Sequence, residues 1–118
     1  EEHAQIFERD GMVEITVAGR TYILKKQFAE DVKAHDIETE TRNLKAALFV
    51  FHDPQDEMVA WQNALDLFDR GPDEKFLITL EDAGHMLSKL VDAEYVANVL
   101  SSYVKNGKKP QGDNIRAA

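Results

Sequence analysis

Two short apolar runs, each followed by a polar loop, constrain the fold of this chain more than any other feature. The first run covers residues 45–52, and its last residue, His52, opens the polar loop His-Asp-Pro-Gln-Asp-Glu. The second run covers residues 75–80 and is followed by the polar loop Glu-Asp-Ala-Gly-His. Continuous runs of this length are typical of strands buried on both faces of a parallel sheet. A buried helix segment is the alternative for the first run, but its shortness and Pro54 favour a strand. The sequence therefore predicts two buried strands.

The segments around these runs predict how the two strands are connected. Met58 to Arg70 places apolar residues on one helical face before Gly71-Pro72, which predicts a crossover helix. A second helix is expected after the second strand, with Asp92 as its N-cap. The order strand, helix, strand, helix over residues 45–107 predicts a βαβ unit with two parallel strands and a trailing helix.

The residues before this unit show two other periods. Alternating apolar and polar residues over 11–24, interrupted at Ala18-Gly19-Arg20, predict a β-hairpin. Residues 25–44 carry a narrow apolar stripe among many charges and predict a solvated helical segment. We therefore expect an α/β fold with a small mixed sheet, one domain over residues 1–107, and a flexible tail over residues 108–118.

Composition excludes several classes of function. Fourteen Lys and Arg against 22 Asp and Glu give a net charge of −8, which argues against nucleic acid as a partner. The absence of cysteine excludes disulfides, a thiolate nucleophile and Cys-based zinc sites. No apolar run of about 18 residues exists, so no membrane span is expected. Because the first five residues are Glu-Glu-His-Ala-Gln, they do not resemble a signal peptide, and a cytoplasmic location is expected. No cofactor is predicted.

An acid and a histidine follow the two predicted strands. Asp56 lies in the first polar loop, and His85 lies in the second loop, 29 residues later. The carboxyl ends of neighbouring parallel strands lie at the same edge of a sheet, so these loops should meet. A carboxylate in that position can hold an imidazole in one tautomer and support it as a general base.

Each of these residues also has a simpler interpretation. Asp56 can cap the following helix, and His85 can be a loop histidine that no longer serves a reaction. The cluster of His52, Asp53, Asp56 and Glu57 contains a single histidine, so a solvated polar loop is favoured over a metal site.

Four segments resemble the α/β-hydrolase family. Residues 48–59 are similar to its seventh strand and acid loop, and residues 79–87 to its eighth strand and histidine loop. The resemblance is closest to esterase-like hydrolases that bacteria often carry fused to an OsmC-type redox domain. Residues 18–28 and 92–97 also have counterparts there, so the resemblance spans about residues 13 to 105.

The resemblance implies a role for both loop residues. Asp56 matches the triad acid, and His85 matches the triad histidine. Asp53 stands at a position where the family often has serine, and it is not the expected acid. The family places its nucleophile upstream, in a G-x-S-x-G elbow. No such motif occurs here, and the three serines, Ser88, Ser101 and Ser102, all follow His85.

These observations leave three hypotheses for function. The leading one is a truncated α/β-hydrolase relative that carries the acid and histidine, is not catalytic alone and associates with itself. The second is the carboxyl-terminal fragment of a serine esterase or acyl hydrolase. The third is a module that binds a small ligand between the Asp56 and His85 loops.

The first strand is expected to need a neighbour along its second edge. In the family it is an interior strand, and without a neighbour its apolar residues would form an exposed edge. The hairpin, a second copy of the chain or a separate chain bearing the serine could cover it. We therefore expect a homodimer, or a partner chain that supplies the missing half of the sheet.

Overall fold

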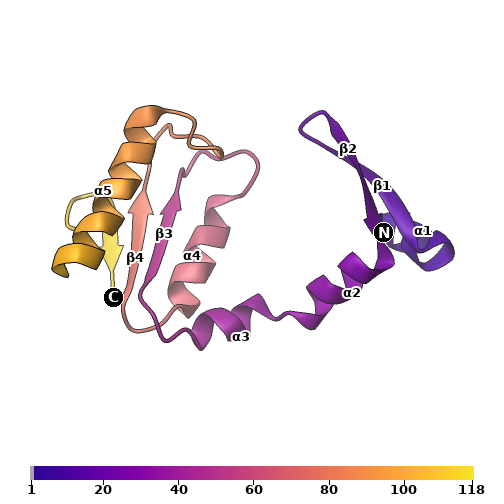
Figure 1. Ribbon diagram of the computed structural model, residues 1–118, viewed down its shortest axis with the longest axis horizontal. Coiled ribbons are helices and arrows are strands. Elements are labelled where there is room, and N and C mark those ends of the chain that lie inside the picture. The colour runs from indigo at the N-terminus through magenta and orange to yellow at the C-terminus, as the bar shows by residue number, and fades with distance from the viewer. Residues whose placement is uncertain (1) are drawn as a thin grey trace. The chain divides into compact units, whose positions relative to one another are not determined.

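The computed structural model describes residues 2–118, without the side chains of residues 2–4 and 7. The elements follow in the order α1 (Glu2–Asp10), β1 (Met12–Val17), β2 (Arg20–Lys25), α2 (Lys26–Ala34), α3 (Ile37–Arg42), β3 (Leu48–His52), α4 (Trp61–Arg70), β4 (Lys75–Thr79), α5 (Leu90–Asn106) and β5 (Ile115–Ala117). Figure 1 shows this order along the chain. The fold class is α/β, as the sequence predicts.

The chain divides into two compact units, one up to Ile37 and one from Glu38 to Ala118. This division differs from the single domain expected over residues 1–107. The reason lies in the charged segment between hairpin and sheet, because α2 has no buried residue. Such a segment has too few apolar side chains to build one continuous core.

The first unit contains the predicted hairpin. Strands β1 and β2 pair antiparallel, and Val17 lies opposite Arg20 across a two-residue turn. Both turn residues, Ala18 and Gly19, have positive φ values of 50° and 76°. This is the conformation that tight hairpin turns require and that glycine adopts without strain.

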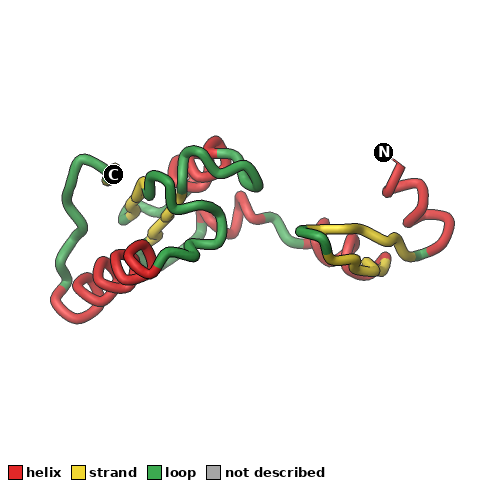
Figure 2. The backbone as a smooth tube through the Cα atoms, turned by 90° about the horizontal axis from the view of Figure 1, so that it is seen from above, coloured by secondary structure: helices red, strands yellow, loops and turns green. Residues whose placement is uncertain are grey.

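The second unit is a sheet in the order β3-β4-β5. Strands β3 and β4 are parallel, with Phe49 opposite Phe76 and His52 opposite Thr79. Helices α4 and α5 lie on opposite faces of this sheet (Figures 1 and 2). The crossover helix begins at Trp61, three residues later than the sequence predicts, and α5 begins at Leu90 with Lys89 as its N-cap instead of Asp92.

Alternate residues of β4 supply the core on the two faces. Phe76 and Ile78 pack with Tyr95, Val96 and other residues on the α5 face. Leu77 packs with Ala64 and Phe68 of α4 on the other face. Both faces of β4 are covered, which agrees with its continuous apolar sequence, because such a sequence is typical of a parallel strand buried on both faces.

Residues 108–118 contain the third strand, where the sequence predicted a flexible tail. Strand β5 pairs antiparallel with β4, and Ile115 lies opposite Ile78. The Asn114 side chain also donates a hydrogen bond to the Tyr95 hydroxyl at 3.0 Å. Three residues with one large apolar side chain are too few to show a strand period, so backbone pairing determines this strand.

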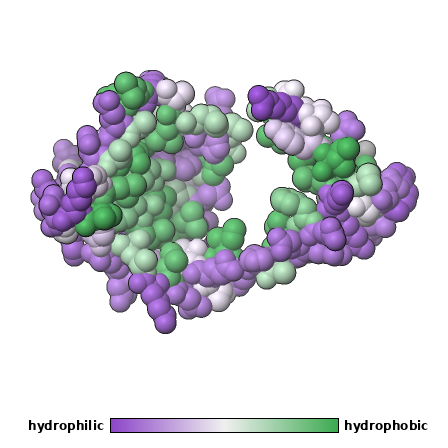
Figure 3. Space-filling model, viewed as in Figure 1, coloured by the Kyte–Doolittle hydropathy of each residue, from purple (hydrophilic) through white to green (hydrophobic). Residues whose placement is uncertain are grey.

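Strand β3 lies at the edge of its sheet. Within residues 2–118 it pairs with β4 alone, and the hairpin forms a separate two-stranded sheet. Phe49 and Phe51 of β3 are only partly buried, and apolar side chains gather on the sheet beside α5 (Figure 3). The second backbone edge of β3 is thus available for pairing.

Candidate active site

The polar loops after β3 and β4 meet at one edge of the sheet. The backbone N–H of Leu80 donates to the His52 carbonyl at 2.9 Å, which extends the parallel pairing to the ends of both strands. Residues 53–60 then form an acid loop, and residues 80–89 form a histidine loop. This placement agrees with the arrangement expected from parallel strands.

Asp56 and His85 form a hydrogen-bonded pair across these loops. The distance from His85 Nδ1 to Asp56 Oδ2 is 2.8 Å. The Asp56 side chain is 3% exposed, whereas that of His85 is 37% exposed. With the carboxylate ionised, Nδ1 carries a proton and donates it, and in the neutral form of the ring Nε2 is then a lone-pair acceptor.

The other carboxylate oxygen of Asp56 is held by its own loop. Asp56 Oδ1 accepts hydrogen bonds from the backbone N–H groups of Met58 at 2.8 Å and Val59 at 3.0 Å. The pKa of Asp56 is lowered to about 2, with the Val59 bond as the largest cause and the bond with His85 as a further contribution to the same shift. Asp56 is therefore a carboxylate at neutral pH. It caps a turn before α4 and also bonds to His85, whereas the helix that it was expected to cap begins at Trp61 with Ala60 as its N-cap.

His52 lies on the other side of the same carboxylate oxygen. Its Nε2 is 3.6 Å from Asp56 Oδ2, and its side chain is 13% exposed. The ring centroid lies 5.6 Å from that of Trp61. Within the described residues, neither buried ring nitrogen has a hydrogen-bond partner.

Asp53 joins the two loops through its carboxylate. Its residue is 6% exposed, and its Oδ1 accepts from the Gln55 N–H at 2.9 Å. Its Oδ2 accepts from the Gly84 N–H in the histidine loop at 2.8 Å. The bonds from Gln55 and Gly84 hold the pKa of Asp53 below its ordinary value. The sequence did not indicate a role for this residue in the site. It could have indicated a turn, because an Asp side chain often accepts a hydrogen bond from the backbone N–H two residues later.

The backbone of the histidine loop has an unusual conformation. Asp82, Gly84 and Leu87 have φ values of 57°, 73° and 45°. For Asp82 and Leu87, which carry side chains, this left-handed region is sterically costly. Lys89 bonds to the carboxylate of Asp82 at 2.9 Å, and this bond raises the pKa of Lys89.

A cavity of about 440 Å³ lies between the two loops, and Asp56 and His85 are among its lining residues. Met58 and Met86, which are 59% and 78% exposed, also line it and give it apolar surface. Such a space with a few convergent polar groups is typical of a small-molecule site.

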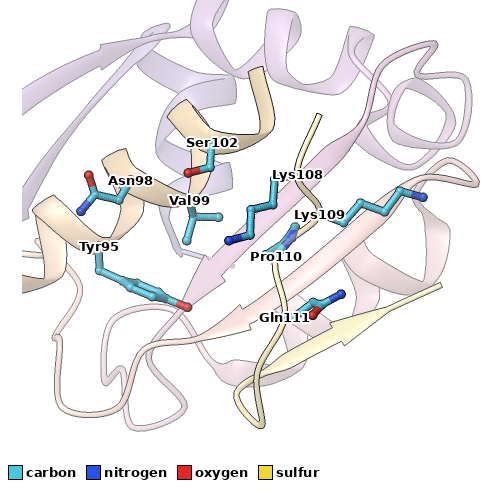
Figure 4. A pocket seen from close by; sticks show the side chains of 8 residues that line it. All are labelled: Tyr95, Asn98, Val99, Ser102, Lys108, Lys109, Pro110 and Gln111. Atoms are coloured by element: carbon cyan, nitrogen blue, oxygen red, sulfur yellow. The ribbon is translucent and has the colours of Figure 1, made fainter. Parts of the chain in front are cut away.

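None of the three serines is bonded to His85 in the part of the chain that the structure describes. Ser88 lines the cavity of His85, three residues further along the same loop. Ser101 and Ser102 belong to α5. Figure 4 shows Ser102 in a different cavity, of about 420 Å³, between α5 and residues 108–111. The loops thus hold an acid and a base without a bonded nucleophile.

Among the side chains that the structure describes, no group of three or more His, Asp or Glu is placed to hold a metal ion. Among the described helices, none has the length and apolarity needed to cross a bilayer.

Comparison with known proteins identifies a similar solved structure. The esterase domain from a Rhodothermus marinus protein has 33% sequence identity to this chain and a TM-score of 0.68. The similarity covers 80% of this chain but only 39% of that esterase domain. No family model matches the chain, and no curated protein matches it significantly. The chain therefore has a partial α/β esterase-like fold.

Proposed function

We propose that this chain supplies the acid and the histidine of a serine-esterase site that hydrolyses carboxylic esters. The observation that carries the proposal is the bond of 2.8 Å between His85 Nδ1 and Asp56 Oδ2. The similarity to an esterase domain supports it independently. On this proposal, the chain is not catalytic without a nucleophile from another polypeptide segment.

On this proposal, each member of the pair has its own role. Asp56 holds the proton of His85 on Nδ1, so that Nε2 can accept the proton of a serine hydroxyl. As the serine oxygen bonds to the ester carbonyl carbon, His85 becomes an imidazolium, which Asp56 stabilises by its negative charge. His85 then donates this proton to the ester oxygen as the bond from the carbonyl carbon to that oxygen breaks and the alcohol leaves. Water, which His85 deprotonates in turn, attacks the resulting acyl-serine, and the serine leaves with the proton of His85 as the carboxylic acid is released.

The free edge of β3 is the proposed place where the remaining part of the sheet joins. Because the similarity covers 39% of the esterase domain, most of that domain has no counterpart here. A serine-bearing segment that pairs along β3 would continue the sheet next to the acid loop. A second copy of the chain, paired edge to edge, is the other proposed occupant. Sedimentation of the purified chain distinguishes the two: a homodimer supports pairing of two copies, and a monomer supports pairing with a serine-bearing segment.

A chimera tests the proposed activity. The matched part of the Rhodothermus marinus esterase domain is replaced by this chain, and hydrolysis of a p-nitrophenyl ester is measured. We expect activity that falls roughly 10⁴-fold or more in His85→Ala. A folded chimera whose activity is unchanged by His85→Ala would contradict the proposal.

The isolated chain provides the complementary measurement. We expect no labelling by a fluorophosphonate probe and no ester hydrolysis above that of its His85→Ala variant, because no serine is bonded to His85. Labelling of Ser88, the serine in the same cavity, would show that this chain contains its own nucleophile and would overturn the proposal of an incomplete site.

A further inference from the structure

Two carboxylates three residues apart use their oxygens in the same way. Asp53 and Asp56 each direct Oδ1 to backbone N–H groups of the acid loop. Each directs Oδ2 to the histidine loop, Asp56 to the ring of His85 and Asp53 to the N–H of Gly84. The histidine loop is therefore held at two neighbouring residues by one short turn.

The Asp53 contact restrains the backbone next to His85. Gly84 directly precedes His85, so a bond of 2.8 Å at Gly84 N restricts where the backbone of His85 can lie. The restrained N–H belongs to the planar peptide unit between Ala83 and Gly84, and only the φ and ψ of Gly84 separate that unit from the one that leads to the Cα of His85. In this hydrogen bond the Gly84 N–H donates to a buried carboxylate, so the bond belongs to the stronger, charge-assisted class.

The backbone of the histidine loop makes such a restraint necessary. Asp82 and Leu87 on both sides of Gly84 have positive φ, a conformation that persists only where contacts impose it. Lys89 restrains the loop at Asp82 through an exposed ion pair, which is a weak interaction. The buried Asp53 bond lies between these two strained residues.

We propose that Asp53 is a positioning residue, whose bond to Gly84 places His85 at hydrogen-bond distance from Asp56. This inference rests on the proposed function, since it concerns the acid–histidine pair of that site. Asp53 itself touches no reacting atom. It acts through the backbone of the histidine loop.

The test follows the ring of His85 by nitrogen-resolved NMR of the full chain. In the wild-type chain we expect the Nδ1–H tautomer, with an Nδ1 proton protected from solvent exchange, identified by its loss in His85→Ala. Asp53→Asn keeps the size of the side chain but removes its charge and one of its two acceptors. We expect Nδ1 proton exchange about tenfold faster in Asp53→Asn, with a larger increase in Asp53→Ala.

A matched control separates positioning from loss of charge. Asp82→Asn removes one negative charge from the histidine loop, and asparagine tolerates the left-handed backbone there. We expect less than a twofold change in Nδ1 proton exchange for this variant. Far-UV circular dichroism checks that each variant keeps its helices, and the isosteric Asp53→Asn decides the test where Asp53→Ala unfolds.

The outcomes distinguish this inference from the proposed function. A protected proton in the wild type that exchanges faster in Asp53→Asn, but not in Asp82→Asn, supports the positioning role. A protected proton that is equally slow in folded Asp53→Asn overturns the positioning role and leaves the proposed function standing. Absence of the Nδ1–H tautomer in the wild type overturns the acid–histidine pair itself.

Discussion

The acid loop and the histidine loop are adjacent, but they are held in different ways. In the acid loop, the side chains of Asp53 and Asp56 accept hydrogen bonds from the loop's own backbone at Gln55, Met58 and Val59. The histidine loop has three residues with positive φ, and Asp53 and Asp56 of the other loop bond to it. The acid loop therefore forms a local template on which the histidine loop is positioned.

The largest expected effect is on the catalytic rate, and it comes from replacing Asp56, which bonds to the histidine loop. In the chimera, Asp56→Asn should lower kcat by roughly 10⁴-fold, because an amide can donate to Nδ1 and favour the wrong tautomer of His85. Esterase assays check this, with exposed Asp69→Asn on α4 as a control for charge. A loss equally large in the control would show that the effect is not specific to the acid loop.

A cavity in the core of the sheet should destabilise the acid loop and the histidine loop to the same extent. Ile78 is fully buried, so Ile78→Ala should lower the free energy of unfolding by about 2–5 kcal/mol. Urea denaturation measures this loss. Hydrogen exchange should speed up in both loops by similar factors, whereas Asp53→Asn should accelerate exchange mainly in the histidine loop. Equal acceleration of both loops in Asp53→Asn would contradict the view that the acid loop supports itself.

Acid should weaken the contacts between the loops. The pKa of Asp56 is lowered to about 2, and that of Asp53 is lowered as well. A carboxyl group whose pKa is lower in the folded state than in the unfolded state stabilises the fold when it is ionised. This stabilisation is complete at a pH above the unfolded value of 3.8, and it is lost as the pH falls towards 2. Urea denaturation from pH 7 down to pH 2 should show this decrease. The decrease should be shallower in Asp56→Asn, and an identical profile there would contradict the assignment.

The smallest effect is expected at the exposed contact of the histidine loop. Lys89→Met removes the ion pair with Asp82, whose carboxylate is 91% exposed. Exposed ion pairs contribute little, so exchange of the Nδ1 proton of His85 should rise about twofold at most. High salt should reduce even this difference between wild type and variant. A change as large as that in Asp53→Asn would place the main restraint at Lys89 instead.

The sequence predicted the elements that have a strong apolar period. The hairpin, the two parallel strands and their helices follow from the spacing of apolar residues, and the meeting of Asp56 and His85 follows from parallel strands. Strand β5 was missed because its three residues pair through backbone groups, and Ile115 is its only large apolar side chain. The division after Ile37 was also missed, since periodicity describes an element but not whether its buried residues join another core.

The role of Asp53 could not be predicted for a related reason. Its hydrogen bond to Gly84 joins residues 31 positions apart, and it depends on the positive φ of a glycine in the other loop. Sequence alone indicates a turn at Asp53 but not the direction of its second oxygen. The starts of α4 and α5 differ from the prediction for a similar reason, because Asp56 caps a turn before α4 and not the helix itself.

The ionisation of Asp56 provides the most direct measurement. A carbon-resolved NMR titration of its carboxyl group should give a pKa of about 2 in the wild-type chain. That pKa should rise in His85→Ala, because the variant loses the hydrogen bond that stabilises the carboxylate. An ordinary pKa near 3.8 that does not change in His85→Ala would contradict the acid–histidine pair.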